Sequence, residues 1–319
     1  MKFHFAPVQG HTDAPYRHFH NLIYNKGAEN EEAVVYYTPF IRLERGELRK
    51  RDIKDFTSEL NRGFKNIPQI IFRDADELTI LVRLMKEHGT TAIDLNMGCP
   101  FPLQTGHGRG AATVANEELA KAVRDTVNAN PDIDFSVKIR LGMTDPDEWK
   151  TLLPYLNETK LTHLAVHPRV AKQQYSGSLY MDRFAEILRE SKNPVVFNGE
   201  IHTPEDVRNL LERFPDEVAS GKLSGVMIGR GLLARPSLIS EIIAGEEIEK
   251  VERVETMLRF HKELYDYYAS ELCGDSQIIS KIQPFWEYAE DEIGRKAWKA
   301  IKKAGNIAKY NSAVASIRN

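Results

Sequence analysis

Residues 194–231, PVVFNGEIHTPEDVRNLLERFPDEVASGKLSGVMIGRG, show the fold class most clearly. The segment begins with a short apolar strand (Pro194–Asn198), continues as an amphipathic helix (Pro204–Phe214) and ends in a second strand (Gly225–Ile228). Thr203 is a favourable N-cap, and a proline opens the helix, so the start of the helix is well marked. A strand, a helix and a strand in this order predict two parallel strands of one sheet.

The same alternation repeats on the N-terminal side of this segment. Six further strands are expected at Lys2–Val8, Ala33–Tyr37, Pro68–Phe72, Ala92–Asn96, Phe135–Arg140 and His163–His167. Helical patterns separate most of them, for example Asp76–His88, where apolar residues recur at helical spacing. Eight strand–helix units in about 240 residues predict an α/β fold of the TIM (β/α)8 barrel type. A doubly wound open sheet is the alternative, although eight repeats favour a closed barrel.

Unusual polar residues gather where the predicted strands end. The endings are Val8-Gln9-Gly10, Asn96-Met97-Gly98-Cys99, Lys138-Ile139-Arg140, His167-Pro168-Arg169, Asn198-Gly199-Glu200 and Gly229-Arg230. The carboxyl-terminal strand ends of a TIM barrel carry its active site, so this clustering predicts an enzyme. Any single ending could be an ordinary loop start, but six together favour a functional rim.

Beyond about residue 240 the strand pattern stops and the sequence becomes helical. We therefore predict a barrel domain over residues 1–243 and a small all-α domain over residues 244–319. The balance of charge reverses within this tail: residues 241–280 hold ten acidic and four basic residues, and residues 281–319 hold four acidic and eight basic residues. Trp286, Tyr288, Trp298 and Tyr310 lie among the basic residues. Such a stretch is compatible with binding RNA phosphates, and equally with a solvated helix face over an aromatic core.

The composition excludes several classes of protein. The 319 residues include 43 basic and 46 acidic side chains, a net charge of −3 and 42% apolar residues, which excludes collagen-like, coiled-coil and disordered chains. No apolar run suits a membrane helix, and the N-terminus has no signal peptide, so no membrane partner is expected. Two cysteines, Cys99 and Cys273, are too few for a disulfide framework, which predicts a cytoplasmic protein. The histidines form no metal motif, so we expect no metal site.

Ile93–Pro100 and the glycines of Gly106–Ala111 give the strongest chemical signal. The glycine stretch matches a dinucleotide fingerprint by letter, but Cys-Pro-Phe-Pro separates it from the strand, which argues against a Rossmann site. A loop over a ligand fits better, because glycines allow close backbone approach. Cys99 lies just past a strand end. The residues alone leave two roles open for it, a thiolate nucleophile or a protonated general acid.

Lys138 and the last two strand ends predict a phosphorylated cofactor. A lysine at the barrel mouth needs an anion or a polar ligand, since its unpaired burial is costly. Schiff-base chemistry and charge compensation for a reduced cofactor are both open uses. The loops after the seventh and eighth strands are the usual phosphate site of a TIM barrel. Glycine amides with Arg230 suit a phosphate monoester, and together with Lys138 they point to FMN.

Seven motifs occur in the order of a known family. They are Ala6–Asp13 (APVQGHTD), Pro68–Ile70, Asp94–Pro100 (DLNMGCP), Val137–Gly142, His167–Arg169, Phe197–Ile201 and Val226–Gly231. With these motifs the chain resembles the tRNA-dihydrouridine synthases, which are FMN-dependent TIM-barrel enzymes with a helical C-terminal domain. The Asn-x-Gly-Cys-Pro element is the most specific, and the helical tail matches in length and type.

The resemblance implies a reaction and a role for each matching residue. Reduced FMN would deliver hydride to C6 of a tRNA uridine, and Cys99 would protonate C5 as the general acid. NADPH would reduce the flavin. The implied flavin-site residues are Pro7, Val8, Gln9, Gln69, Lys138, His167, Asn198, Gly199, Glu200, Gly229 and Arg230. Gln69 would bond the polar edge of the flavin, Lys138 would compensate its charge, and Asn198, Gly199, Glu200, Gly229 and Arg230 would hold its phosphate.

The resemblance also implies substrate contacts. Asn96 would orient the uracil, and Arg169 is assigned to the substrate as well. The cations of the helical tail would bind tRNA, namely Arg295, Lys296, Lys299, Lys302 and Lys303. The likeness is greatest to the bacterial branch that acts on the D-loop, and we expect a monomer. Cys273 is expected to be a structural residue.

Two departures from the family pattern concern loops. The family usually has a small residue and a lysine after Cys99-Pro100, where this chain has Phe101-Pro102-Leu103, and Pro168 replaces a glycine. Because that lysine would contact RNA phosphate, RNA docking at this loop is expected to differ. Two rival functions remain open. One is a flavin barrel that reduces a small pyrimidine or enone and needs no basic tail, and the other is an RNA-binding relative without catalysis.

Overall fold

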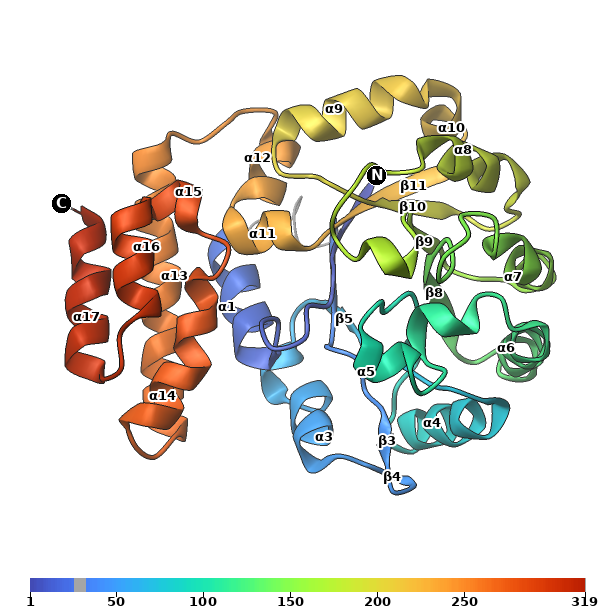
Figure 1. Cartoon of the computed structure of the whole chain (residues 1–319), viewed down its shortest axis with the longest axis horizontal. Helices are drawn as coiled ribbons and strands as arrows, with labels where there is room; N and C mark the ends of the chain where they lie inside the picture. Colours follow the sequence, from blue (N-terminus) through green and yellow to red (C-terminus); the bar gives the residue numbers. More distant parts are fainter. Residues whose placement is uncertain (26–32, 319) are drawn as a thin grey trace.

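The computed structural model describes residues 1–25 and 33–318 and shows a parallel β-barrel with helices around it and more helices at one side (Figure 1). The barrel strands are β1 (Lys2–Phe5), β2 (Val34–Tyr37), β5 (Lys65–Ile67), β6 (Gln69–Ile70), β7 (Ala92–Met97), β8 (Asp134–Arg140), β9 (Leu164–His167), β10 (Val195–Asn198) and β11 (Leu223–Ile228). They pair in the order β5-β2-β1-β11-β10-β9-β8-β7-β6.

The two ends of this order belong to one interrupted strand. Only Pro68 separates β5 from β6, and β5 pairs with β2 while β6 pairs with β7. Proline has no N–H to donate to a neighbouring strand, but the Pro68 carbonyl accepts from the Asp94 N–H at 3.0 Å. β5 and β6 therefore occupy one strand position, and the barrel closes with eight strand positions. The predicted TIM barrel is confirmed, and the doubly wound alternative is wrong.

Some strands differ from the prediction near the carboxyl-terminal edge of the barrel. The first strand stops at Phe5 rather than Val8, and residues 6–8 continue into the loop before α1 (Ala14–Tyr24). A small antiparallel hairpin, β3 (Leu43–Glu44) with β4 (Glu47–Leu48), was not predicted. Its strands have two residues each, too short to show an alternating pattern.

Helices surround the barrel, and most of them bury apolar side chains against it. They are α1, α3 (Lys50–Phe56), α4 (Ala75–Glu87), α6 (Glu117–Ala129), α7 (Trp149–Leu156), α8 (Met181–Glu190), α9 (Pro204–Arg213), α10 (Pro215–Ala219), α11 (Arg230–Ala234) and α12 (Leu238–Ala244). The two helices predicted in detail are confirmed to within one residue as α4 and α9. Thr203 caps α9 in a reciprocal box, because its hydroxyl accepts from the Asp206 N–H at 3.2 Å and the Asp206 carboxylate accepts from the Thr203 N–H at 2.8 Å.

Within the described residues, five α-helices follow a break at Gly245, which has a left-handed φ of 71°. They are α13 (Lys250–Glu271), α14 (Asp275–Ile282), α15 (Glu290–Ile293), α16 (Arg295–Lys302) and α17 (Ile307–Ala315). Figure 1 shows them beside α1 and α11, and Phe260 of α13 packs edge-on against Tyr16 of α1 with ring centres 4.9 Å apart. Residues 241–318 contain no strand, as predicted. None of the described helices has the length and apolarity that a bilayer span requires.

Candidate active site

A cavity of about 310 Å³ opens at the carboxyl-terminal ends of the strands. Its lining includes Cys99, Asn96 and all eleven predicted flavin-site residues: Pro7, Val8, Gln9, Gln69, Lys138, His167, Asn198, Gly199, Glu200, Gly229 and Arg230. These residues come from distant parts of the sequence and meet because parallel strands end at the same edge of the barrel. His11, Arg140, Tyr175 and Tyr288 also line the cavity and had no assigned role.

A buried hydrogen-bond chain runs from the barrel interior to the Cys99 turn. Asp94 accepts from the Ser136 hydroxyl at 2.5 Å and from Gln69 Nε2 at 2.7 Å. Gln69 Oε1 in turn accepts from Asn96 Nδ2 at 2.7 Å. Asn96 Oδ1 accepts from the backbone N–H groups of Gly98 and Cys99, at 3.1 and 3.0 Å. Because a carboxylate only accepts, Asp94 sets the orientation of both amides.

Asp94 itself is fully buried in the barrel. Burial raises the pKa of its carboxyl to about 6, although the Ser136 and Gln69 hydrogen bonds and the nearby Lys138 charge act to lower it. Lys138 is shifted in the opposite direction for the same reason. Burial, followed by the charge of Arg140, lowers the pKa of its ammonium to about 8. Lys138 is therefore mostly protonated at neutral pH and is a cation at the floor of the cavity.

Cys99 is held tightly by the glycine-rich loop. The Ala111 N–H donates to the Cys99 carbonyl at 3.0 Å. A Cβ on Gly110 would lie 2.5 Å from that carbonyl oxygen, and Gly110 has a φ of 63°, so only glycine fits. Burial raises the pKa of the Cys99 thiol, against the lowering effects of the Phe101 backbone, Lys138 and Arg140. The side chain is therefore a neutral thiol at pH 7, able to donate a proton.

The loops after β10 and β11 form a cradle with a fixed arginine. Glu200 accepts a hydrogen bond from Arg230 at 2.9 Å and is also bonded to His202 at 2.9 Å and to Arg169. The His202 hydrogen bond, with those of Arg169 and the Arg230 charge, lowers the pKa of the Glu200 carboxyl to about 2. A Cβ on Gly199 would lie 2.4 Å from the Phe197 ring, so any side chain here would have to displace that buried ring. The cradle presents backbone amides and one oriented guanidinium, which suit a phosphate monoester.

The surroundings of Arg169 and His167 bear on the roles expected for them at the substrate and the cofactor. Arg169 does not line the cavity: it is buried behind Glu200 and donates to the Gly177 carbonyl at 2.7 Å. His167 does line it, and burial with the charges of Arg140 and Lys138 holds the pKa of its imidazole well below its usual value. His167 is therefore neutral at pH 7.

Tyr175 and Arg140 are rim residues that sequence reasoning did not assign. The Arg230 guanidinium lies 4.3 Å from the centre of the Tyr175 ring, and that of Arg140 lies 5.2 Å from it. Arg140 could have been found, because it closes a predicted strand. Tyr175 belongs to a loop with no motif, so only the fold brings it to the cavity.

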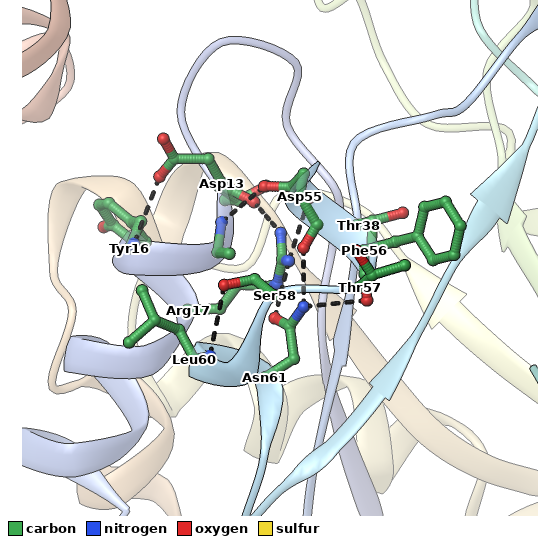
Figure 2. Close-up of polar contacts among 12 residues, drawn as sticks. Asp13, Tyr16, Arg17, Thr38, Asp55, Phe56, Thr57, Ser58, Leu60 and Asn61 are labelled. Carbon is green, nitrogen blue, oxygen red and sulfur yellow. Dashed lines mark hydrogen bonds and ion pairs between the residues drawn. The ribbon is translucent and has the colours of Figure 1, made fainter. Parts of the chain in front are cut away.

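A polar network around Arg17, Asp55 and Asn61 holds the start of α1 and the end of the loop before it (Figure 2). Arg17 of α1 is buried and donates to the Thr12 carbonyl at 2.6 Å, to Asp55 at 3.0 Å and to Asn61 at 2.9 Å. Asp13 joins this loop to the C-terminal helices, because it accepts from Tyr268 at 2.8 Å and pairs with Lys281 at 2.6 Å. The helices after Gly245 thus contact the barrel directly beside the cavity.

The predicted tRNA-binding cations lie on or next to α16, away from the cavity lining. Arg295, Lys296, Lys299, Lys302 and Lys303 are all exposed. Within the described residues, the four lysines have no carboxylate partner. The aromatic residues among them serve different purposes. Trp286 and Tyr310 are buried and bonded to each other at 3.0 Å, while Lys302 stacks on Trp298 with its Nζ 4.2 Å from the ring centre.

Cys273 is exposed and is not part of the core. The described residues contain no group of three histidine, cysteine, aspartate or glutamate side chains arranged for a metal ion.

The sequence and the fold of this chain are both similar to those of known proteins. The family model described as dihydrouridine synthase matches residues 4–316. A Treponema pallidum protein named as a probable tRNA-dihydrouridine synthase is 27% identical over 99% of this chain and 92% of its own length. The tRNA-dihydrouridine synthase B of Yersinia pestis is 26% identical over 94% of this chain and 91% of its own length. The old yellow enzyme of Trypanosoma cruzi shares the fold, with a TM-score of 0.51 and 10% identity over 78% of this chain and 89% of that one.

Proposed function

The chain belongs to the dihydrouridine synthase family, and we propose that it reduces a D-loop uridine of tRNA, with FMN as its cofactor and NADPH as the reductant. The observation that carries this proposal is the cavity, which combines a phosphate cradle with a buried thiol. When bound, FMN would supply the hydride for C6 of the uracil.

The cradle supports a phosphorylated cofactor. Arg230 is fixed by Glu200, and Gly199 and Gly229 lie beside it at the ends of neighbouring strands. At Gly231 an added Cβ would lie 2.0 Å from the carbonyl oxygen of Ile201. The two backbone segments therefore pack too closely for a side chain at this position. We propose that these residues hold the ribityl phosphate and that Asn198, whose amide donates to the Met227 carbonyl at 2.8 Å, keeps the two strand ends in register.

Cys99 supports the second half of the reaction. Its raised pKa keeps the thiol protonated at neutral pH, which a general acid requires and a nucleophile does not. We propose that Cys99 Sγ donates its proton to C5 of the uracil as C6 accepts the hydride. Lys138 would compensate the negative charge that reduction places on the cofactor, since it is a cation within the same cavity.

The amide orientations limit how Asn96 and Gln69 can act. The oxygen of Asn96 is occupied by two backbone N–H groups, and that of Gln69 by Asn96. Each side chain is therefore left with an N–H as its free group. We propose that Asn96 donates to a carbonyl oxygen of the uracil and that Gln69 donates to an acceptor on the flavin edge, while Arg169 acts by holding Glu200.

The position of the helices supports tRNA as the substrate. They contact the loop beside the cavity through Asp13, and α16 exposes lysines to solvent that pair with no carboxylate in the part of the chain that the structure describes. We propose that residues 244–319 form the tRNA-binding domain and that the protein works as a cytoplasmic monomer. Phosphate contacts from these lysines would give tRNA binding a strong dependence on salt.

The direct test is to incubate the purified protein with NADPH and tRNA that lacks dihydrouridine, and to map the modified nucleotide by mass spectrometry. We expect a yellow protein and a gain of two hydrogen atoms at one D-loop uridine. A yellow protein that reduces free pyrimidines or enones but leaves tRNA unchanged would favour the small-molecule reductase. A protein that takes up no flavin would contradict both enzyme functions.

A further inference from the structure

The loop after Cys99 exposes two large apolar side chains, and one of them, Phe101, lines the cavity. Leu103 has 79% of its surface exposed, the largest fraction among the large apolar residues of the described chain, and Phe101 has 46%. Tyr175, at 41%, lies across from Phe101 with ring centres 6.3 Å apart. Large exposed apolar side chains that cluster beside a site usually mark a binding surface. We call Phe101 and Leu103 together the apolar tip.

The apolar tip is held on a rigid loop, so its exposure is not the result of a loose segment. Phe101 precedes the short helix α5 (Pro102–Thr105), and the Arg109 N–H donates to the Gln104 carbonyl at 3.1 Å. Arg109 is itself buried and forms a two-point ion pair with Glu77 of α4, with Nε at 3.2 Å and a second nitrogen at 2.5 Å. A buried pair of this kind fixes the loop on the barrel. The backbone that carries the apolar tip is therefore anchored to the barrel before any partner binds.

The surface around the apolar tip favours the bases of a nucleic acid as its partner. The guanidinium groups of Arg140 and Arg230 lie against Tyr175, but Arg140 is buried and Arg230 pairs with Glu200 in the cradle. The apolar tip therefore offers aromatic and apolar surface beside cations that are already held within the cavity. Bases match such a surface, because each has an apolar face that can stack on an aromatic ring.

The distance along the chain places the apolar tip next to the reacting nucleotide. Phe101 and Leu103 are two and four residues from Cys99, a reach of at most about 7 and 13 Å. Enzymes that act on a base must take it out of its stack, which leaves its neighbours without a stacking partner. Apolar side chains often insert between bases in such complexes.

We propose that the apolar tip is a wedge that packs against the bases flanking the target uridine and replaces the stacking lost when this uridine enters the cavity. This inference rests on the proposed function, since it requires tRNA as the substrate. In this proposal Phe101 and Leu103 make an apolar contact at a loop where the family pattern has a lysine. Unlike a contact between lysine and phosphate, an apolar contact releases no counterions from the tRNA.

The test separates apolar from ionic contacts by their dependence on salt. Fluorescence anisotropy would measure the binding of unmodified tRNA transcripts to the FMN-loaded enzyme over a range of salt concentrations. The double variant Phe101→Ala/Leu103→Ala should bind about 10-fold more weakly at every salt concentration. The slope of log affinity against log salt should equal that of the wild type, because no phosphate contact is lost.

Three further variants complete the design. Val251→Ala, at a residue 73% exposed on α13, is the matched control and should bind as the wild type. Leu103→Met keeps the apolar surface and should also bind as the wild type, whereas Leu103→Lys should steepen the salt dependence. Melting temperatures would show that each variant is folded.

Unchanged affinity in the double variant, or a weaker affinity with a shallower salt slope, would overturn the wedge. Failure of the proposed function is a separate outcome: the wild-type enzyme itself would then neither bind tRNA nor form dihydrouridine. A wild type that modifies tRNA and a double variant that binds equally well would refute the wedge alone.

Discussion

The cavity and helix α16 carry the two sets of predicted functional residues, and the fold treats them differently. Residues of the cavity come from the ends of seven strands and are fixed by buried hydrogen bonds, such as the chain from Asp94 to Cys99. The lysines of α16 are exposed and have no carboxylate partner among the described residues. A side chain at a strand end has one direction available to it, whereas an exposed lysine samples many rotamers.

Because of this difference, single substitutions should have strong effects in the cavity and weak effects on α16. In the cavity each residue makes contacts that no neighbour can replace, so one change should remove a whole step. On α16 the lysines contribute similar and additive charge, so several must change together before binding falls.

The strongest test of the cavity is Cys99→Ala. Loss of a general acid typically slows a reaction by about 10²–10⁴-fold, and we expect that decrease in the rate of dihydrouridine formation. The bound flavin should still be reduced by NADPH, because that step needs no proton from Cys99. Stopped-flow absorbance measures flavin reduction, and mass spectrometry measures the product. Cys273→Ala, at the exposed cysteine, is the matched control. Equal product formation in both variants would remove Cys99 from the mechanism.

Arg230→Met tests the phosphate cradle, with a smaller expected effect. A hydrogen bond to a charged group contributes about 1.5–3 kcal/mol, so FMN affinity should fall by about 10- to 150-fold. Riboflavin, which has no phosphate, should bind the variant and the wild type equally. Flavin fluorescence on titration of the apoprotein measures both affinities. Arg213→Met, at an exposed arginine of α9, provides the control. Full retention of FMN affinity in Arg230→Met would place the phosphate elsewhere.

On α16 the expected effect is smaller still for each residue. When Lys296, Lys299, Lys302 and Lys303 are replaced together by Gln, tRNA binding should depend less on salt. The slope of log affinity against log salt is negative, and its magnitude should decrease by up to about 3. A single replacement should change it by less than about 1. The control replaces Lys192 and Lys222, which lie together at another surface of the barrel. If one lysine carried the whole effect, α16 would behave like the cavity, and the contrast between the two regions would be wrong.

The same contrast explains how much the sequence could predict. Strand ends such as Asn198-Gly199-Glu200 were predictable because the alternation of strands and helices places them at one edge. Tyr175 was missed because it reaches the cavity only through a long loop, and the β3–β4 hairpin was missed because its strands are so short. The hydrogen-bond direction at Gln69 and Asn96 depends on the buried Asp94 carboxylate, which no motif spacing reveals. Trp286 and Tyr310 resembled RNA-binding aromatics in sequence but are core residues.

The smallest expected effect concerns the pH dependence of stability at Asp94, beneath the cavity. Because burial raises the pKa of this carboxyl to about 6, the folded protein holds a proton that the unfolded chain releases near pH 4. Stability from this group is thus present at pH 4 and is lost as pH rises toward 6. Asp94→Asn keeps an acceptor for Gln69 and cannot ionise. Its melting temperature relative to the wild type should therefore rise by a few degrees between pH 4 and pH 6.

Glu200→Gln supplies a control of opposite sign. The pKa of the Glu200 carboxyl is lowered to about 2, so its stabilising effect is present above pH 4 and is lost as pH falls toward 2. The effect should be weak, because Glu200 is partly exposed and solvent screens its ion pairs. Scanning calorimetry between pH 3 and pH 7 measures both variants. If Asp94→Asn and the wild type lost stability in parallel from pH 4 to pH 6, the carboxyl would be ionised throughout. Asp94 would then hold the Gln69 and Asn96 amides as a permanent anion beside Lys138.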